Sequence, residues 1–171
     1  MAPGRASRSG FTLVELLVVV FIIALLLTVV GLRGGGARER RMLEDEGARL
    51  EQLIRLGGEE AVLAARQVGI VFSRDGYHFV LLDGQRWTPT DDQGVLRPRS
   101  LPEDIALSLR VEGESLDEGL SDGDGDTPQV LLLSSGETTA FEVELRNTGG
   151  EVQLLSVDAW GEIEREWGPG T

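Results

Sequence analysis

Three patterns of hydrophobic and polar positions follow one another along the chain. From Phe11 to Leu32 almost every position is apolar. A helix of about 22 residues rises roughly 33 Å, which is enough to cross the hydrocarbon core of a bilayer. We therefore expect a transmembrane helix over residues 11–32. The small-residue step Ser9-Gly10 precedes this segment, whereas a secretory signal peptide has its cleavage site after a shorter apolar region.

The second pattern is an amphipathic helix that follows a run of glycine residues. Residues 33–36 read Arg-Gly-Gly-Gly, which predicts a break in the helix and a hinge. From about Ala37 to Arg66, apolar or small residues recur at spacings of three and four, as on one face of a helix. This stripe consists of Leu43, Gly47, Leu50, Ile54, Gly57, Ala61, Ala64 and Val68. We assign residues 33–66 to the hinge and the amphipathic helix.

The third pattern, beyond Gln67, is a series of short apolar or alternating segments separated by glycine and aspartate residues, the first two of which form a predicted hairpin. It predicts strands at residues 68–73, 77–82, 85–88, 105–111, 129–133, 139–145 and 152–157. The acidic tail that carries Trp160 and Trp167 is interpreted as a final strand, although exposed aromatic residues also suit a partner contact. A long helix followed by antiparallel strands is typical of an α+β fold, with the helix stripe against a sheet. Residues 67–171 would form this β-rich head.

Composition excludes several classes of function. The formal net charge is −13, which disfavours binding to nucleic acid because the phosphate backbone requires clustered positive charge. The chain has no cysteine, so neither disulfides nor thiolate metal sites are possible. His78 is the only histidine, which weakens most acid–base and triad schemes. We expect a protein that is not an enzyme, has no catalytic residues and needs no cofactor.

One residue stands out within the apolar segment. Glu15 is an acid in an otherwise apolar run, and an unpaired carboxylate at the centre of a membrane helix costs ~2.5–3.5 kcal/mol on insertion scales. Such residues are functional candidates by default, although a carboxylate near the end of a span can also reach the headgroups.

The residues around Glu15 resemble a known signal. Gly10-Phe11-Thr12-Leu13-Val14-Glu15 is similar to the class III signal of type IV pilins and pseudopilins. The resemblance implies that a prepilin peptidase cuts between Gly10 and Phe11, so that residues 1–10 form a leader, and that it methylates Phe11. The new amine at Phe11 of one subunit would pair with Glu15 of another, which removes much of the cost of each isolated charge and fixes the register of assembly.

The head carries a second resemblance. The segments are Tyr77–Phe79, Trp87–Pro89, Leu96–Pro102 and Pro128–Phe141, and they look like the globular domain of the H-type minor pseudopilins of type II secretion systems. The resemblance implies a type IV pilin-like fold, in which a long N-terminal helix packs on two antiparallel sheets in a sandwich-like head.

The same resemblance implies a function, a location and partners. The precursor would cross the inner membrane once, with its head in the periplasm. After processing it would join the pseudopilus near the tip, beside the major pseudopilin and the other minor pseudopilins, on the inner-membrane secretion platform, and would aid export of folded proteins. The alternatives are a type IV pilus minor pilin for adhesion or DNA uptake, and a single-pass anchored binding protein that does not polymerise.

Two other segments suggest site chemistry. Asp122, Asp124 and Asp126 alternate as calcium ligands do, but Thr127 and Leu133 stand where an EF-hand loop has glycine and a bidentate glutamate. A solvated loop is the preferred interpretation, and no metal site is assigned. The segment Ser134–Glu137 lacks the strand–turn–helix setting of a nucleophile.

Overall fold

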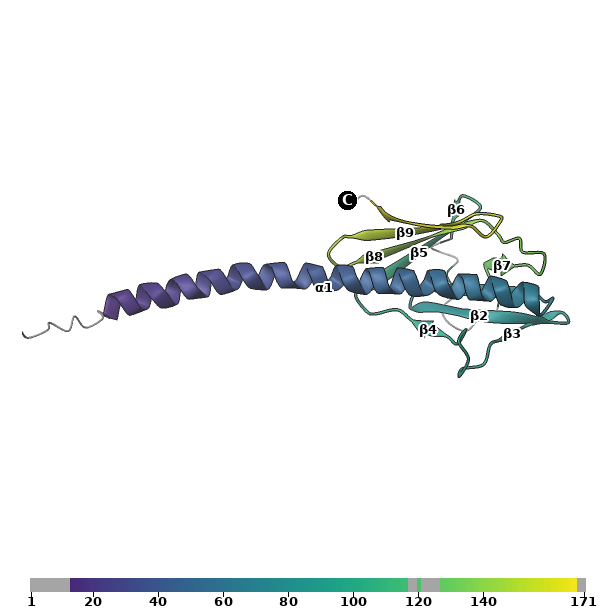
Figure 1. Ribbon diagram of the computed structural model, residues 1–171, viewed down its shortest axis with the longest axis horizontal. Helices are drawn as coiled ribbons and strands as arrows, with labels where there is room; N and C mark the ends of the chain where they lie inside the picture. Colours follow the sequence, from purple (N-terminus) through teal and green to yellow (C-terminus); the bar gives the residue numbers. More distant parts are fainter. Residues whose placement is uncertain (1–12, 117–119, 121–126, 169–171) are drawn as a thin grey trace, which may run out of the picture. The chain divides into compact units, whose positions relative to one another are not determined.

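The computed structural model describes residues 13–116, 120 and 127–168, with only the backbone described for residues 26–35. One helix, α1 (Leu13–Leu63), precedes a series of strands (Figure 1). The strands are β1 (Val68–Ser73), β2 (Gly76–Asp83), β3 (Arg86–Pro89), β4 (Arg99–Ser100), β5 (Ile105–Val111), β6 (Glu114–Ser115), β7 (Val130–Leu132), β8 (Phe141–Asn147), β9 (Val152–Val157) and β10 (Ile163–Gly168). Contacts divide the chain into two compact units, residues 1–38 and 39–171.

The predicted break in the helix at residues 33–36 is wrong. The backbone of the three glycine residues is helical, and α1 continues without interruption from Leu13 to Leu63. Each glycine costs a helix about 1 kcal/mol relative to alanine. Extending a helix that is already formed is far easier than nucleating a new one. The long helical segments on both sides therefore keep the glycine residues helical despite this cost.

The second unit, which we call the head, contains two antiparallel sheets. One has the order β3-β2-β1-β7, with β4 paired to β2, and the other has the order β10-β9-β8-β5-β6. The α+β class and the antiparallel sheets are therefore confirmed. The predicted ends of β1, β5 and β9 agree with the structure, and the tail forms β10. The two-residue strands β4 and β6 were missed because so short a segment shows no alternation.

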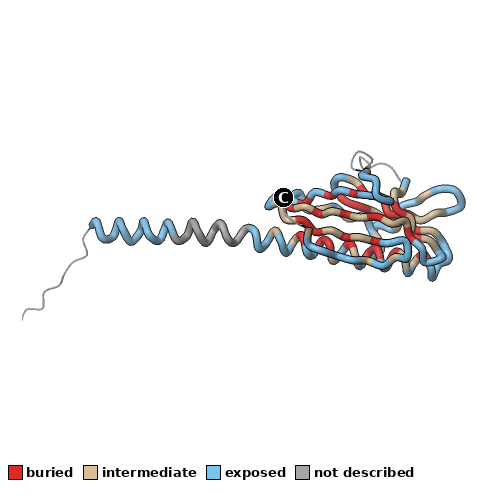
Figure 2. Tube along the Cα trace, turned by 90° about the horizontal axis from the view of Figure 1, so that it is seen from above, coloured by how far each residue is buried: buried red, intermediate tan, exposed pale blue. Residues whose placement is uncertain are grey.

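The buried core of the head lies where α1 meets the strands. Leu43, Leu50, Ile54 and Ala61 from the predicted stripe are buried, and they join side chains of both sheets in one cluster. Figure 2 shows buried segments on both the helix and the strands of the head. Ala64, by contrast, is exposed because α1 ends one residue before it.

Two glycine residues of α1 allow the helix to touch both sheets closely. A Cβ atom on Gly47 would collide with Gln153 of β9, in one sheet. On Gly57, nearly three helical turns further on, it would lie 2.9 Å from Leu132 Cδ1 of β7 and 3.2 Å from Phe79 Cε1 of β2, in the other sheet. Glycine at these positions therefore sets how closely the helix packs.

Strand β10 is fastened to α1 by polar contacts. Arg165 donates a hydrogen bond of 3.1 Å to the carbonyl oxygen of Glu44 and lies 3.4 Å from the Glu51 carboxylate. Near the other end of β10, the guanidinium of Arg40 stacks 4.1 Å from the centre of the Trp167 ring. We call these contacts of Arg165 and Trp167 the β10 clasp.

A buried polar cluster lies under the helix. Among the described residues, the hydroxyl of Tyr77 and the Oε2 atom of Glu46 are buried without a hydrogen-bond partner. The other carboxylate oxygen of Glu46 accepts a hydrogen bond from Arg49. Burial raises the pKa of Tyr77 to about 12, and the Glu46 carboxylate adds to the rise, whereas Arg49 and Arg99 oppose it.

The two adjacent glycine residues of α1 make a matched test of this packing. We expect Gly58→Ala to stabilise the head by about 0.5–1 kcal/mol, because alanine favours the helix and nothing lies within 4 Å of the added Cβ. We expect Gly57→Ala to lose stability, because overpacking against Leu132 and Phe79 costs about 1–3 kcal/mol and outweighs the same gain. Urea unfolding followed by tryptophan fluorescence measures both, and equal shifts would show that the contact at Gly57 is not tight.

A second prediction concerns alkaline pH. The folded pKa of Tyr77 lies above its ordinary value of 10, so its contribution to stability is fully present below pH 10 and is lost as the pH rises through about 12. Tyr77 is the only tyrosine in the chain, so the ultraviolet absorbance of phenolate reports this group alone. We expect a midpoint near pH 12, or an earlier abrupt rise that coincides with unfolding. A smooth titration near pH 10 in the folded protein would contradict the burial of this ring.

Candidate functional site

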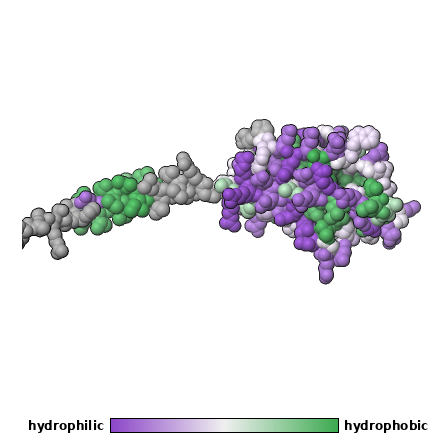
Figure 3. All heavy atoms as spheres, in the orientation of Figure 1, coloured by the Kyte–Doolittle hydropathy of each residue, from purple (hydrophilic) through white to green (hydrophobic). Residues whose placement is uncertain are grey.

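The first described turns of α1 form an apolar surface with one acid. From Leu13 to Leu25, the large apolar side chains are each 43–82% exposed, and Glu15 lies in the first turn of the helix. Figure 3 shows this part of α1 as mostly hydrophobic surface. A helix that is hydrophobic on all sides is expected in a protein core, a membrane or an assembly, because exposing its apolar side chains to water is unfavourable. Glu15 therefore lies on a surface that has to be covered.

The other predicted site residues fall outside the described part of the chain. These are Gly10 and Phe11 at the predicted cleavage site, and the calcium candidates Asp122, Asp124 and Asp126. Among the residues that the structure does describe, no three acidic or histidine side chains are grouped as a metal site would need.

Within residues 13–116, 120 and 127–168, the structure has no helix that combines the length and the hydropathy needed to cross a membrane.

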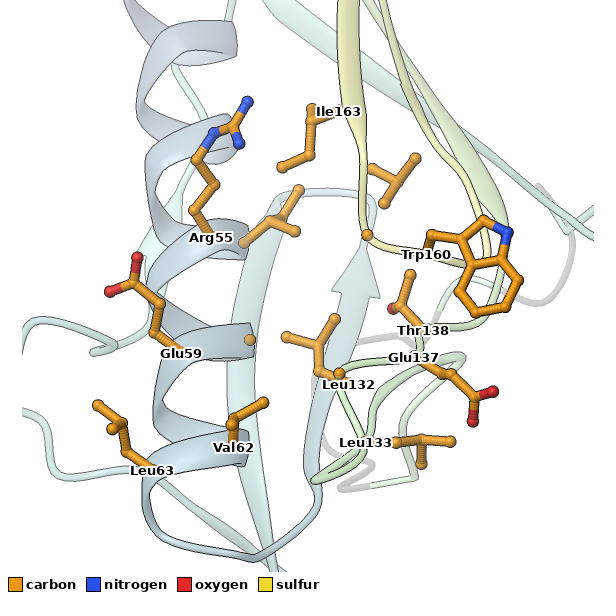
Figure 4. Close-up of a pocket in the computed structure, with 15 residues that line it drawn as sticks. Arg55, Glu59, Val62, Leu63, Leu132, Leu133, Glu137, Thr138, Trp160 and Ile163 are labelled. Carbon is orange, nitrogen blue, oxygen red and sulfur yellow. The ribbon is translucent and has the colours of Figure 1, made fainter.

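The head has a second candidate site, a cavity of about 490 Å³ between the last turns of α1 and the two sheets. Its apolar lining includes Ile54, Val62, Leu132, Val157, Trp160 and Ile163. We call it the apolar groove. Figure 4 shows Val62 on the helix facing Leu132, with Trp160 on the side away from the helix.

Acidic side chains border the apolar groove. The carboxylate of Glu59 lies on the helix side and forms no ion pair or hydrogen bond with any described residue. On the opposite side, the carboxylate of Glu137 accepts a 3.1 Å hydrogen bond from the hydroxyl of Ser135 and has no cationic partner among the described residues. The cation at this border, Arg55, is already paired with Glu51 at 3.1 Å. The groove thus has an apolar floor and a net negative edge.

A tight turn between β9 and β10 presents Trp160 at this edge. The Oδ1 atom of Asp158 accepts hydrogen bonds of 2.9 Å from the backbone N–H groups of Trp160 and Glu162. Gly161 has a φ of +78°, a conformation that glycine adopts without strain. The side chain of Trp160 is 77% exposed, so a large ring is displayed on a backbone that is already ordered.

Sequence reasoning found only part of the apolar groove. It considered Trp160 and Trp167 as possible partner contacts, and the structure places Trp160 at the groove and Trp167 under Arg40. Val62 and Leu63 were missed because they lie off the buried stripe. The signal that could have found them is a pair of large apolar residues on the polar side of an amphipathic helix.

Comparison with known families gives two matches that together cover most of the chain. Residues 5–31 match the prokaryotic N-terminal methylation motif, which spans the predicted cleavage site and Glu15. Residues 46–161, which include most of the helix stripe and every strand except β10, match the family described as type II transport protein GspH.

Individual relatives agree. The type II secretion system protein H of Pseudomonas aeruginosa is 38% identical over 165 residues, 92% of this chain and 93% of the relative. The protein of the same name from Aeromonas hydrophila is 31% identical and covers 88% of this chain and 87% of the relative. In fold, the chain is similar to the minor pseudopilin EpsH of Vibrio cholerae, with a TM-score of 0.60 and 21% identity over 75% of this chain and 98% of that structure. The two family matches and these relatives show that the chain belongs to the GspH family, the minor pseudopilins of type II secretion, and carries the N-terminal methylation motif.

Proposed function

We propose that the chain is made as a single-pass precursor in the inner membrane with its head in the periplasm, and that it is cut between Gly10 and Phe11. It is then methylated at Phe11 and incorporated at or near the tip of the pseudopilus, with the major and the other minor pseudopilins. The observation that supports this proposal best is the exposed apolar surface from Leu13 to Leu25, interrupted only by Glu15 in the first helical turn.

The chemistry of assembly follows from that surface. Cleavage creates a cationic amine one helical turn before Glu15. Packing of helices side by side excludes water from both charges, and a buried charge that loses its partner costs about 3–5 kcal/mol. An arrangement in which the amine of one subunit meets Glu15 of its neighbour avoids that cost, so the pair selects one axial register among the many that an apolar helix alone would allow.

The assembly surface and the head then have separate tasks. In this proposal the N-terminal part of α1 supplies a general apolar contact, which any pilin-like subunit can share. The head supplies the surface that is particular to this subunit. The role in secretion needs no catalytic residue in this chain, because the mechanical work of extending a filament comes from other components of the machinery.

The first test is the chemical identity of the mature N-terminus. We expect intact mass and N-terminal sequencing of protein purified from its native membrane to show a chain that starts at Phe11 with one added methyl group. Gly10→Val should leave residues 1–10 attached, because the cut follows a residue without a side chain. A native chain that retains its first ten residues would overturn the proposal.

The second test separates insertion from assembly. We expect Glu15→Leu to be inserted and cleaved normally but to co-purify with pseudopili at least about tenfold less, since the neighbour's amine is left without its counter-charge. Val18→Leu, on the same helix, is the matched control and should assemble normally. Equal incorporation of Glu15→Leu and the control would indicate an anchored protein that does not depend on this charge pair.

A further inference from the structure

Strand β10 has a backbone edge that the sheet does not use. It forms one end of its sheet and pairs with β9 (Figure 1, yellow). The N–H group of Asp158 donates a 3.1 Å bond to the carbonyl oxygen of Glu162, which sets the alternation along the pair. The N–H and C=O groups of Ile163, Arg165 and Trp167 therefore point away from β9, and no hydrogen bond joins them to another described residue.

This edge is both open to solvent and ordered. Arg165 as a whole residue is exposed, although its side chain, which reaches to α1, is only 28% exposed. The main chain at Arg165 therefore supplies much of the exposed area. The β10 clasp meanwhile holds Arg165 and Trp167 against α1 through their side chains. A strand that is already ordered binds a partner at a low entropic cost.

The other ends of the two sheets are protected in ways that β10 is not. Exposed sheet edges are usually blunted by short strands, proline or bulges. Strands β4 and β6 have two residues each, and β3 has four and ends at Pro89. The outer side of β7 is already bonded, because Leu131 accepts a 3.0 Å bond from the N–H group of Thr139 and donates one of 3.1 Å to its hydroxyl. Strand β10 instead pairs in continuous register over six residues and contains no proline.

The outer face beside this edge carries carboxylates without a cation opposite them. Elsewhere in the same sheet, Arg110 of β5 lies opposite Glu142 of β8 and pairs with it at 2.7 Å. On β10, Glu164 and Glu166 lie on the same face as Glu142, opposite uncharged residues of β9. Neither forms an ion pair with any residue that the structure describes. A strand added beside β10 would occupy the positions from which cations can meet them.

We propose that β10 binds an extended segment of a partner protein as an added antiparallel strand, and that this segment carries lysine or arginine at two alternate positions. The backbone of Ile163, Arg165 and Trp167 supplies the hydrogen bonds, and the two cations lie opposite Glu164 and Glu166. A second copy of β10 does not suit this edge, because antiparallel pairing of the strand with itself sets Glu164 opposite Glu166, and like charges directly opposite are destabilising.

Affinity and selectivity come from different parts of this contact. Main-chain hydrogen bonds form with any extended segment, so the two cations provide the selectivity. The whole chain has a formal charge of −13 and attracts cations in general, so a test needs a control of equal net charge. This inference does not depend on leader cleavage or on Glu15, so its failure and that of the proposed function are separate results.

N-methylated peptides test the backbone contact. The probe is a fluorescent capped peptide, Thr-Lys-Val-Lys-Val-Thr, titrated with the full-length chain in non-ionic detergent at low salt and followed by anisotropy. Antiparallel pairing turns the valine N–H groups towards β10 and the lysine N–H groups away from it. We expect N-methylation of both valines to weaken binding at least about tenfold, and N-methylation of both lysines to change it less than about twofold. No binding of the parent peptide, equal losses with both methylated peptides, or a loss confined to the methylated lysines would overturn the proposal.

A charge reversal tests the selectivity. Glu166→Lys and Glu114→Lys change the net charge equally, but Glu114 lies on β6, at the opposite end of the same sheet. We expect Glu166→Lys to weaken binding of the lysine peptide about fivefold, because an attraction becomes a repulsion, and Glu114→Lys to change it less than about twofold. Both glutamates are exposed, which argues that both variants fold. Equal weakening would indicate a general attraction to the acidic chain and would overturn the proposal, as would unchanged binding to Glu166→Lys.

Discussion

The close contact between one face of α1 and two separate sheets is the constraint on which the rest of the head depends. The sheets share no strand, and what unites them is the buried cluster that the helix stripe completes. Gly47 and Gly57 allow this approach, one over each sheet. A side chain at either position would lift the helix from one sheet, and the apolar side chains of that sheet would lose part of their cover.

The same helix leaves two apolar surfaces uncovered, and they differ in chemistry. The surface from Leu13 to Leu25 is long, regular and apolar, with an acid at its start. Such a surface suits any partner with a similar helix. The apolar groove is short and irregular, and its edge is acidic. A surface of that kind recognises shape and charge together, so it can distinguish partners that the regular helix treats alike.

The parts of the fold that could be predicted from the sequence are those whose hydrophobic pattern extends over several residues. The helix stripe and strand β5 were predicted well because each repeats a period several times, and β1 and β9 because each is a short, mostly apolar segment bounded by turn residues. The break at residues 33–36 was predicted wrongly, since the local glycine preference was weaker than the cooperativity of the helix around it. Glu46 is buried although its side chain is charged, because Arg49 of the next turn partners it within the helix. The pattern of apolar residues along the helix does not reveal such a pair of charged side chains.

The candidate sites were also predictable only where a continuous stretch of sequence carries the signal. Glu15 stands out because it is one charge in a long apolar run. The apolar groove is formed by residues from α1, β7, β9 and the turn at Trp160, which are far apart in sequence, so no single segment carries its signature. The ordered Asp158 turn could be anticipated from the Asp-x-Trp-Gly sequence, but its position beside the end of α1 is a property of the folded sheets.

The β10 clasp has a mechanical consequence. Arg165 and Trp167 engage α1 at points more than two helical turns apart, between Arg40 and Glu51. A force applied along the helix axis would therefore load all of these contacts in shear at the same time. A force perpendicular to the axis would instead open them one after another. The strength of the head would then depend on the direction of the pull, with greatest resistance along the axis of the helix.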